Sequence, residues 1–211
     1  MKKQPIGIFD SGVGGLTVAH AIKQLLPGES IIYFGDTAHL PYGDKSADAI
    51  MSYSRRITEF LLDHQAKVIL VACNSASASA YDSLREEFGR RTVIIDVIDP
   101  VVDYLGSRQF NKLGVIGTKR TISSGMYDQK LRKRSPDTSV VSLATPLLVP
   151  MIEEGFIFDD ISNAIIRTYL SNDSLSGIEA LVLGCTHYPI IKNQISKFFN
   201  FNIEVIDSGR V

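Results

Sequence analysis

The stretch ILVACNSASA, residues 69–78, contains the pattern that decides the fold. An aliphatic run typical of a buried strand ends at Cys73, and small polar residues follow it at once. The same arrangement returns in ALVLGCTH, residues 180–187, where the run ends at Cys185. These are the two cysteines of the sequence, and each half of the chain carries one. The repetition predicts a strand in each half that ends at a cysteine, and it is the first indication that the two thiols act as a pair.

Similar aliphatic runs recur along the chain, and amphipathic stretches follow most of them. Continuous aliphatic strands that alternate with helices are typical of parallel sheets covered on both faces. The sequence therefore predicts an α/β fold with doubly wound parallel sheets, which bind ligands at the carboxyl ends of the strands. The expected strands are residues 5–10, 31–36, 67–74, 92–98, 112–118, 138–145, 178–186 and 202–208.

A domain boundary is expected near Asp99 and Pro100, because proline restricts the residue before it and tends to interrupt regular structure. This boundary gives a first α/β domain of residues 1–98 and a second of residues 99–205. We expect the C-terminal segment, residues 206–211, to return to the first domain and complete it.

The composition excludes several classes of protein. Hydrophobic residues make up 45% and charged residues 21% of the 211 residues, which is an ordinary globular composition. The formal net charge of −1 gives no general affinity for polyanions, so nucleic acid is not an expected partner. The aliphatic runs are shorter than a membrane span, and the N-terminal residues lack the apolar segment of a signal peptide. We therefore expect no membrane partner and a cytoplasmic location, where thiols stay reduced.

A glycine-rich turn, DSGVGGLT at residues 10–17, follows the first expected strand. Such turns bind phosphates through backbone N–H groups at the start of a helix. A dinucleotide fingerprint that begins at Gly12 requires glycine at position 17, which is Thr17, and the lysine of a nucleotide-binding P-loop is absent. A tight turn that presents Asp10 and Ser11 to a small carboxylate ligand fits the sequence better than a nucleotide site.

The cysteines are open to two interpretations. A cysteine after an aliphatic strand is often a small core residue. Here each one ends a strand, precedes hydrogen-bonding side chains, and stands before an expected helix start, whose positive end lowers the pKa of a thiol. His187, two residues after Cys185, also leaves open a thiol hydrolase, although that chemistry gives Cys73 no role.

Other polar residues receive simpler interpretations. No Cys-x-x-Cys or paired histidine spacing is present, so no metal site is expected, and His20, His39 and His64 are interpreted as structural or solvated. The basic run KLRKR, residues 130–134, is interpreted as an exposed helix end. In the polar turn GDTAHLPYG, residues 35–43, we expect Asp36, Tyr42 and Gly43 to line a cleft.

Six motifs together resemble the glutamate racemases of the aspartate/glutamate racemase superfamily. They are GIFDSGVGGLTV, GDTAHLPYG, VACNSASA, GVIGTKRTISS, VPMIEEG and VLGCTHYP, and they follow one another from residue 6 to the C-terminus. The resemblance implies two α/β domains with the active site in the cleft between them. It also implies a bacterial cytosolic isomerase that makes D-glutamate for peptidoglycan and needs neither pyridoxal phosphate nor a metal.

The resemblance assigns roles to particular residues. The catalytic thiols fall on Cys73, the base for D-glutamate, and Cys185, the base for L-glutamate. The other catalytic groups fall on Asp10, His187 and one acid of the Glu153–Glu154 pair, for which the motif favours Glu153. The substrate-binding residues fall on Asp10, Ser11, Pro41, Tyr42, Gly43, Asn74, Ser75, Thr118, Thr121, Thr186 and His187. Ser75 stands where the family more often has threonine, and either hydroxyl can make the same hydrogen bond.

The residues make chemical sense without the family. Inversion at a carbon removes a proton from one face and returns one to the other, which requires two acid/base groups on opposite faces. One cysteine in each half supplies such a pair, and amide and hydroxyl side chains suit a substrate with two carboxylates. The two-thiol device does not fix the length of the substrate, so aspartate or another small amino acid remains an alternative.

A further alternative concerns the end of the chain. The family's chains normally continue past VIDSG, whereas this sequence ends at Val211. A weakly active or inactive glutamate-binding homologue is therefore a third interpretation, ahead of a nucleotide-binding oxidoreductase. The sequence leaves the oligomeric state open, with a homodimer as one arrangement.

Overall fold

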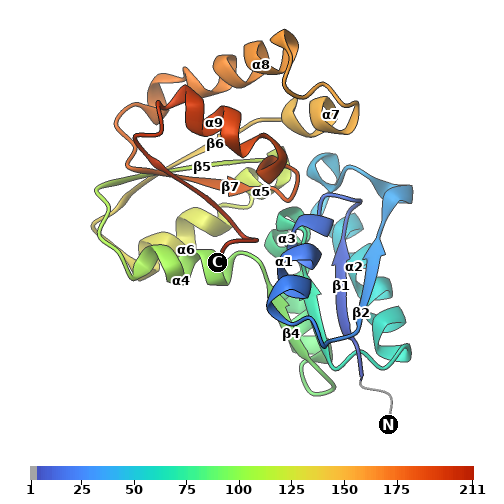
Figure 1. Ribbon diagram of the computed structural model, residues 1–211. Helices are drawn as coiled ribbons and strands as arrows, with labels where there is room; N and C mark the ends of the chain where they lie inside the picture. Colours follow the sequence, from blue (N-terminus) through green and yellow to red (C-terminus); the bar gives the residue numbers. More distant parts are fainter. Residues whose placement is uncertain (1–3) are drawn as a thin grey trace.

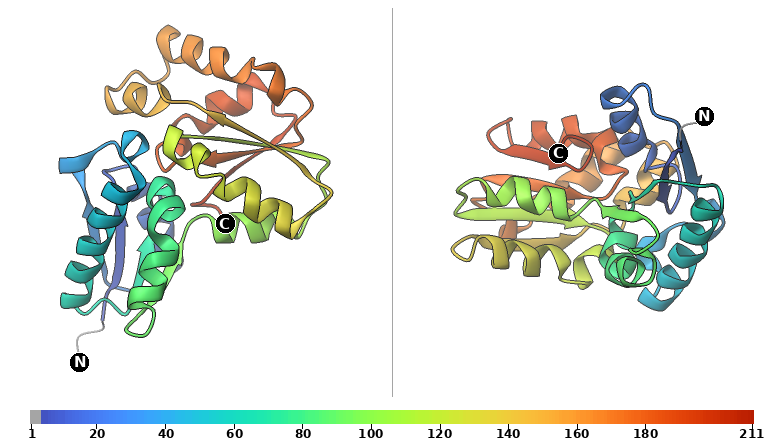
Figure 2. Two further views of the ribbon diagram at one scale, coloured as in Figure 1. Left: turned by 180° about the vertical axis from the view of Figure 1, so that it is seen from behind. Right: turned by 90° about the horizontal axis from the view of Figure 1, so that it is seen from below.

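A computed structural model describes residues 4–211 and contains two parallel β-sheets, each covered by helices on both faces (Figure 1). The two sheets form separate lobes, which are also distinct when the molecule is seen from behind (Figure 2). The predicted α/β class with two parallel-sheet domains is therefore confirmed. None of the helices in residues 4–211 combines the length and the apolar character needed to cross a membrane.

The first domain contains four parallel strands in the order β2-β1-β3-β4. The strands are β1 (Ile6–Asp10), β2 (Ile31–Gly35), β3 (Val68–Val71) and β4 (Val93–Asp96). Its helices are α1 (Leu16–Leu25), α2 (Ala47–Asp63) and α3 (Asn74–Phe88), with short 3₁₀ turns η1 (Thr37–His39) and η2 (Tyr42–Asp44) after β2.

The second domain repeats this strand order as β6-β5-β7-β8. The strands are β5 (Lys112–Gly117), β6 (Ser139–Ala144), β7 (Ala180–Gly184) and β8 (Glu204–Asp207). Its helices are α4 (Asp99–Gly106), α5 (Lys119–Ser123), α6 (Met126–Arg134), α7 (Leu148–Glu153), α8 (Asp160–Leu170) and α9 (Lys192–Phe198), with 3₁₀ turns η3 (Asp173–Leu175) and η4 (Tyr188–Ile191).

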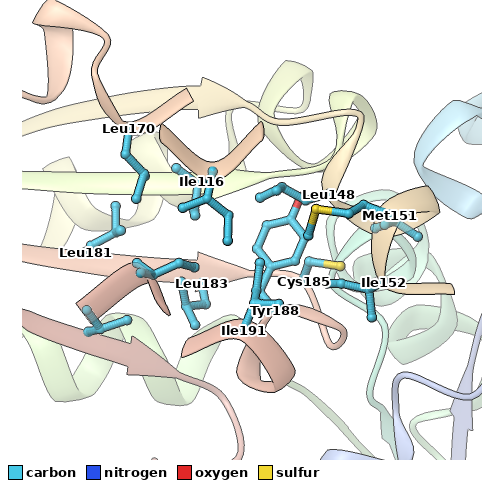
Figure 3. Packing of buried hydrophobic residues seen from close by; sticks show 14 of the residues in the cluster. Ile116, Leu148, Met151, Ile152, Leu170, Leu181, Leu183, Cys185, Tyr188 and Ile191 are labelled. Atoms are coloured by element: carbon cyan, nitrogen blue, oxygen red, sulfur yellow. The ribbon is translucent and has the colours of Figure 1, made fainter. Parts of the chain in front are cut away.

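Burial on both faces explains why the central strands β3 and β7 are aliphatic throughout. Successive side chains of a strand point to opposite faces. In β3, Ile69 and Val71 therefore join the core under α2 and α3, whereas Leu70 joins the core under α1. In β7, Leu183 joins the core that Figure 3 shows, and Val182 joins the core on the opposite face. An alternating pattern of apolar and polar residues is instead typical of a sheet that has one face in contact with solvent.

The repeated strand order makes the two cysteines equivalent. In the first sheet the chain passes from β1 to β2 on one side and then crosses back to β3 on the other side of β1, so the direction of winding reverses between β1 and β3. In the second sheet it reverses in the same way between β5 and β7. Ligands of doubly wound folds bind at this point, outside the carboxyl ends of the strands. Cys73 follows β3 and Cys185 follows β7, so each thiol lies at the reversal point of its own sheet.

One expectation about the domains needs correction. Residues 206 and 207 belong to β8, which pairs with β7 in the second sheet, so this part of the C-terminal segment extends the second domain and not the first. Ser208 and Val211 do line the same pocket as first-domain residues such as Val18 and Leu70. Residues 119–134 form the two helices α5 and α6, because Gly125 adopts a left-handed conformation with φ of 65° between them.

The helix α8 was not predicted from the sequence. Asp159 and Ser162 form a reciprocal capping box at its N-terminus, which satisfies backbone N–H groups that a helix start leaves unpaired. Ile166 and Leu170, four residues apart, are buried in the second domain. Both features are visible in the sequence, so the helix was predictable.

Candidate active site

A small cavity lies where the reversal points of the two sheets meet. Its volume is about 20 Å³, which is close to the minimum needed for one water molecule. Residues of both domains line it: Ser11, Leu40, Pro41, Tyr42, Gly43, Cys73, Asn74, Ser75, Thr118, Val149, Gly184, Cys185, Thr186 and His187. Both thiols therefore line one cavity, and each comes from a different domain.

The glycine-rich turn holds the carboxylate of Asp10, which is fully buried at the end of β1. The backbone N–H groups of Gly12 and Gly15 donate to Asp10 Oδ2 at 3.0 and 3.1 Å. A Cβ atom at Gly15 would lie 2.5 Å from the Cβ atom of Asp10, so this approach requires glycine. Because these N–H groups already donate to Asp10, they are not available to bind a phosphate. This argues against the nucleotide interpretation of the turn.

Asp10 also connects the two domains. The hydroxyl group of Thr186, from the second domain, donates to Asp10 Oδ1 at 3.2 Å. Gly14 lies so close to the second domain that an added Cβ atom would be 2.5 Å from the His187 ring. The turn therefore fixes the position of the segment that carries Cys185.

Cys73 is the N-cap residue of α3 and is 5% exposed. Its Sγ atom lies 3.7 Å from the Ser11 hydroxyl oxygen. Burial, followed by the negative charge of Asp10, raises the pKa of Cys73 to about 12, and hydrogen bonds from the Ala76 backbone and from Ser11 oppose this rise. The sequence analysis expected a lowered pKa from the helix start. That expectation is wrong in direction, because the loss of hydration outweighs the helix end.

Cys185 is the counterpart in the second domain and is 6% exposed. Its Sγ atom lies 3.7 Å from His187 Nδ1, and His187 Nε2 contacts the carboxylate of Glu153. Burial raises the pKa of Cys185 as well, against the same expectation. Figure 3 shows Cys185 beside Met151 and Ile152 of α7, the helix that also carries Glu153. Of the two adjacent acids, the contact with His187 falls on Glu153, which the sequence favoured.

A loop after β2 supplies one wall of the cavity. Tyr42 is fully buried in this wall, and its hydroxyl donates to Asp36 Oδ2 at 2.6 Å. The same carboxylate is 2.8 Å from His39 Nδ1, and the His39 ring stacks on Tyr53 with centroids 3.9 Å apart. Asp36 was expected to line the cleft, but it lies behind Tyr42 and holds it. His39 has the structural role that the sequence analysis gave it.

Hydroxyl and amide groups complete the site. The Ser75 hydroxyl lies 2.8 Å from the Thr118 hydroxyl and 3.2 Å from that of Thr121, so the network crosses between the domains. Thr118 also accepts a hydrogen bond from the Thr121 backbone as the N-cap of α5. Asn74 is 2% exposed, and its Oδ1 atom accepts a hydrogen bond from the Tyr127 hydroxyl at 2.7 Å.

The structure brings the sequence-derived site residues into one place, in two layers. Most of them line the cavity directly, whereas three lie just behind it and bond to residues that do: Asp10, Thr121 and Glu153. The sequence analysis did not name the lining residues Leu40, Val149 and Gly184, nor Tyr127. Gly184 directly precedes Cys185, Leu40 directly precedes Pro41 and Val149 begins the VPMIEEG motif, so these three were detectable by position. Tyr127 contacts the site only through tertiary packing.

The remaining histidines lie outside this site. His20 bonds to Gln24 and His64 bonds to the Phe60 carbonyl, both on exposed helix surfaces. Within residues 4–211, no three His, Cys, Asp or Glu side chains are grouped so that they could hold a metal ion. In the basic run, Lys130, Arg132 and Arg134 each pair with an aspartate.

Comparison with known proteins gives consistent results. Residues 13–211 match the family model of the Asp/Glu/Hydantoin racemases. A glutamate racemase of Neisseria meningitidis serogroup C is 40% identical over 208 residues, which cover 99% of this chain and 77% of the relative. The crystal structure of glutamate racemase from Francisella tularensis in complex with D-glutamate has a TM-score of 0.91 and 42% identity, covering 99% of this chain and 78% of that one. Glutamate racemase isoform RacE1 from Bacillus anthracis has a TM-score of 0.93 and 36% identity, with the same coverage of the two chains.

Proposed function

The chain belongs to the Asp/Glu/Hydantoin racemase family and, within it, to the glutamate racemases, and we propose that it interconverts L- and D-glutamate with Cys73 and Cys185 as its two bases. One observation carries the mechanistic part of the proposal. The two thiols lie at equivalent strand ends of two domains and line the same small cavity.

The proposed reaction transfers two protons and changes no oxidation state. The thiolate of one cysteine removes the Cα proton from its face of the amino acid, and the C–H electron pair is delocalised into the adjacent carboxylate. The thiol of the other cysteine then donates its proton to the opposite face, which produces the other enantiomer. We assign Cys73 as the base for D-glutamate and Cys185 as the base for L-glutamate. The reverse reaction exchanges these roles.

Burial of the thiols has a consequence for this mechanism. Because both pKa values are raised, both cysteines are protonated in the free protein at neutral pH. The ammonium group of a bound amino acid brings a positive charge beside the thiols, and a nearby positive charge favours the thiolate. We therefore propose that the reactive thiolate forms only when substrate is bound. Asp10 beside Cys73, and His187 with Glu153 beside Cys185, are the groups that assist the proton transfers.

The remaining polar residues suit the two carboxylates of glutamate. Asn74, Ser75, Thr118 and Thr186 place amide or hydroxyl groups at the cavity wall, and α3 begins at Asn74 beside them. Such donors stabilise the negative charge that develops on the substrate carboxylate when the Cα proton leaves.

The proposal includes a cellular role. D-glutamate made by this reaction would supply peptidoglycan synthesis in the cytoplasm. Two free buried cysteines suit a compartment that keeps thiols reduced.

The direct test is incubation of the purified chain with L-glutamate, followed by chiral chromatography. The proposal predicts that D-glutamate accumulates until both enantiomers are equal in amount. L-aspartate is assayed in parallel and is expected to react at a small fraction of that rate. Faster inversion of aspartate would overturn the substrate assignment. A folded chain that inverts neither amino acid, even at millimolar concentrations, would overturn the proposed activity.

A further inference from the structure

Asn74 has a buried hydrogen-bond donor without a partner. The residue is 2% exposed and lines the cavity between the domains. Its Nδ2 atom is buried and makes no hydrogen bond within residues 4–211. A buried amide N–H group left unpaired costs on the order of 1–3 kcal/mol, so native proteins leave few of them. An unpaired donor in a cavity wall therefore indicates a group that bonds to a ligand.

The other end of the same amide is held by Tyr127. This tyrosine belongs to α6 of the second domain and is 2% exposed. Its hydroxyl donates to Asn74 Oδ1 at 2.7 Å, across the domain interface. Burial raises the pKa of Tyr127 far above its ordinary value, so the hydroxyl keeps the proton that it donates.

The opposite orientation of the amide is less favourable. If the amide were turned over, Nδ2 would donate to the Tyr127 oxygen, and the Tyr127 proton would lose the acceptor that it has in the structure. Asn74 Oδ1 would then take the position in which Nδ2 has no partner. The observed orientation leaves one unpaired group and the alternative leaves two. The Tyr127 hydroxyl therefore determines which end of the amide is left free for a ligand.

Local structure places the Tyr127 ring for this contact. The left-handed conformation of Gly125 separates α5 from α6 and lets α6 begin next to the interface. The ring then lies against Gly184, where an added Cβ atom would be 3.3 Å from Tyr127 Cε2. Gly184 is the residue before Cys185, so the tyrosine lies between the two thiol-bearing segments and contacts both.

We propose that Tyr127 is a positioning residue, which turns the N–H group of Asn74 toward a carboxylate of the bound amino acid. The inference rests on the proposed function, because it needs a substrate with a carboxylate in the cavity. Tyr127 does not itself line the cavity. The substrate-facing donor in the first domain is thus oriented by a residue of the second domain, and it is oriented correctly only when the two domains are in contact.

The first test replaces Tyr127 with phenylalanine, which keeps the ring and removes the hydroxyl. The variant should fold, and KM for glutamate should rise roughly 10- to 100-fold, which corresponds to loss of a hydrogen bond to a charged group. Tyr104→Phe is the matched control. It also removes a tyrosine hydroxyl bond, that to Glu204, but Tyr104 lies on α4 and does not line the cavity. Its KM should stay within about twofold of the wild-type value.

A double-mutant cycle separates positioning from general stabilisation of the interface. The cycle combines Tyr127→Phe with Asn74→Ala and measures the Kd of racemic glutamate by calorimetry, a readout that requires no turnover. If Tyr127 acts through the amide, Tyr127→Phe weakens binding in the wild-type background and has no further effect once Asn74 is alanine. Equal effects in both backgrounds, or a KM change below twofold in Tyr127→Phe, would overturn the inference. A wild-type chain without racemase activity would instead overturn the proposed function.

Discussion

Gly14 offers a sharp test of how the domain interface positions His187. A Cβ atom at this residue would lie 2.5 Å from both Cε1 and Nδ1 of the His187 ring and 2.8 Å from the Thr186 hydroxyl. Atoms in ordinary contact are about 3.5–4.0 Å apart, so Gly14→Ala forces a displacement of about 1 Å. The atom that must move, His187 Nδ1, is the one that faces Cys185.

The displacement predicts a loss of activity rather than of folding. A misplacement of about 1 Å in a catalytic group can lower a rate on the order of 100-fold. The domains can relieve the clash by moving apart, so the melting temperature should stay within about 4 °C of the wild-type value. We therefore expect kcat/KM for glutamate to fall by about two orders of magnitude while the far-ultraviolet circular dichroism spectrum stays unchanged.

Gly28→Ala is the matched control, because an added Cβ atom at Gly28 meets no atom within 4 Å. Both variants are assayed by circular dichroism at a wavelength where the glutamate enantiomers differ. Gly28→Ala should racemise glutamate at the wild-type rate. If Gly14→Ala does so too, the close approach of the glycine turn to His187 does not position the catalytic group, and the reasoning is refuted.

Two further predictions follow from the electrostatics of the site. Glu153→Gln should lower kcat/KM at least about tenfold, because the amide no longer provides a charged partner for His187. Glu154 lacks that contact, so Glu154→Gln should behave as the wild type. Equal activities of the two variants would contradict the assignment of Glu153. Iodoacetamide reacts with the thiolate and not with the thiol. Because burial raises the pKa of Cys73 to about 12, the alkylation rate of Cys73 in the free protein should rise about tenfold per pH unit from pH 7 to pH 9. A plateau of the rate in that range would show that burial does not control the pKa of this thiol.

The sequence predicts those parts of the molecule that depend on local pattern. The aliphatic runs identify β3 and β7, and their position before Cys73 and Cys185 places each thiol at the carboxyl end of a strand. The capping box at Asp159 is equally local, so α8 was predictable although no prediction was made for it. Local pattern is sufficient here because strands buried on both faces have a characteristic composition.

Tertiary packing decides the features that the sequence did not reveal. The thiol pKa values depend on how completely the two domains exclude water, and no motif reports that. The contact between Tyr127 and Asn74 joins residues of different domains, so sequence spacing gives no indication of it. The strand β8 was assigned correctly as a strand, but its pairing with β7 is a long-range choice that depends on the rest of the second sheet.

The central claim is that two thiols act on opposite faces of one carbon. The most direct measurement incubates the wild type, Cys73→Ala and Cys185→Ala with L-glutamate in D₂O and determines both the enantiomer and the deuterium content at Cα. The account predicts that the wild type forms D-glutamate that carries deuterium at Cα, and that neither variant forms it. Formation of D-glutamate at the wild-type rate by either variant would contradict the two-thiol mechanism.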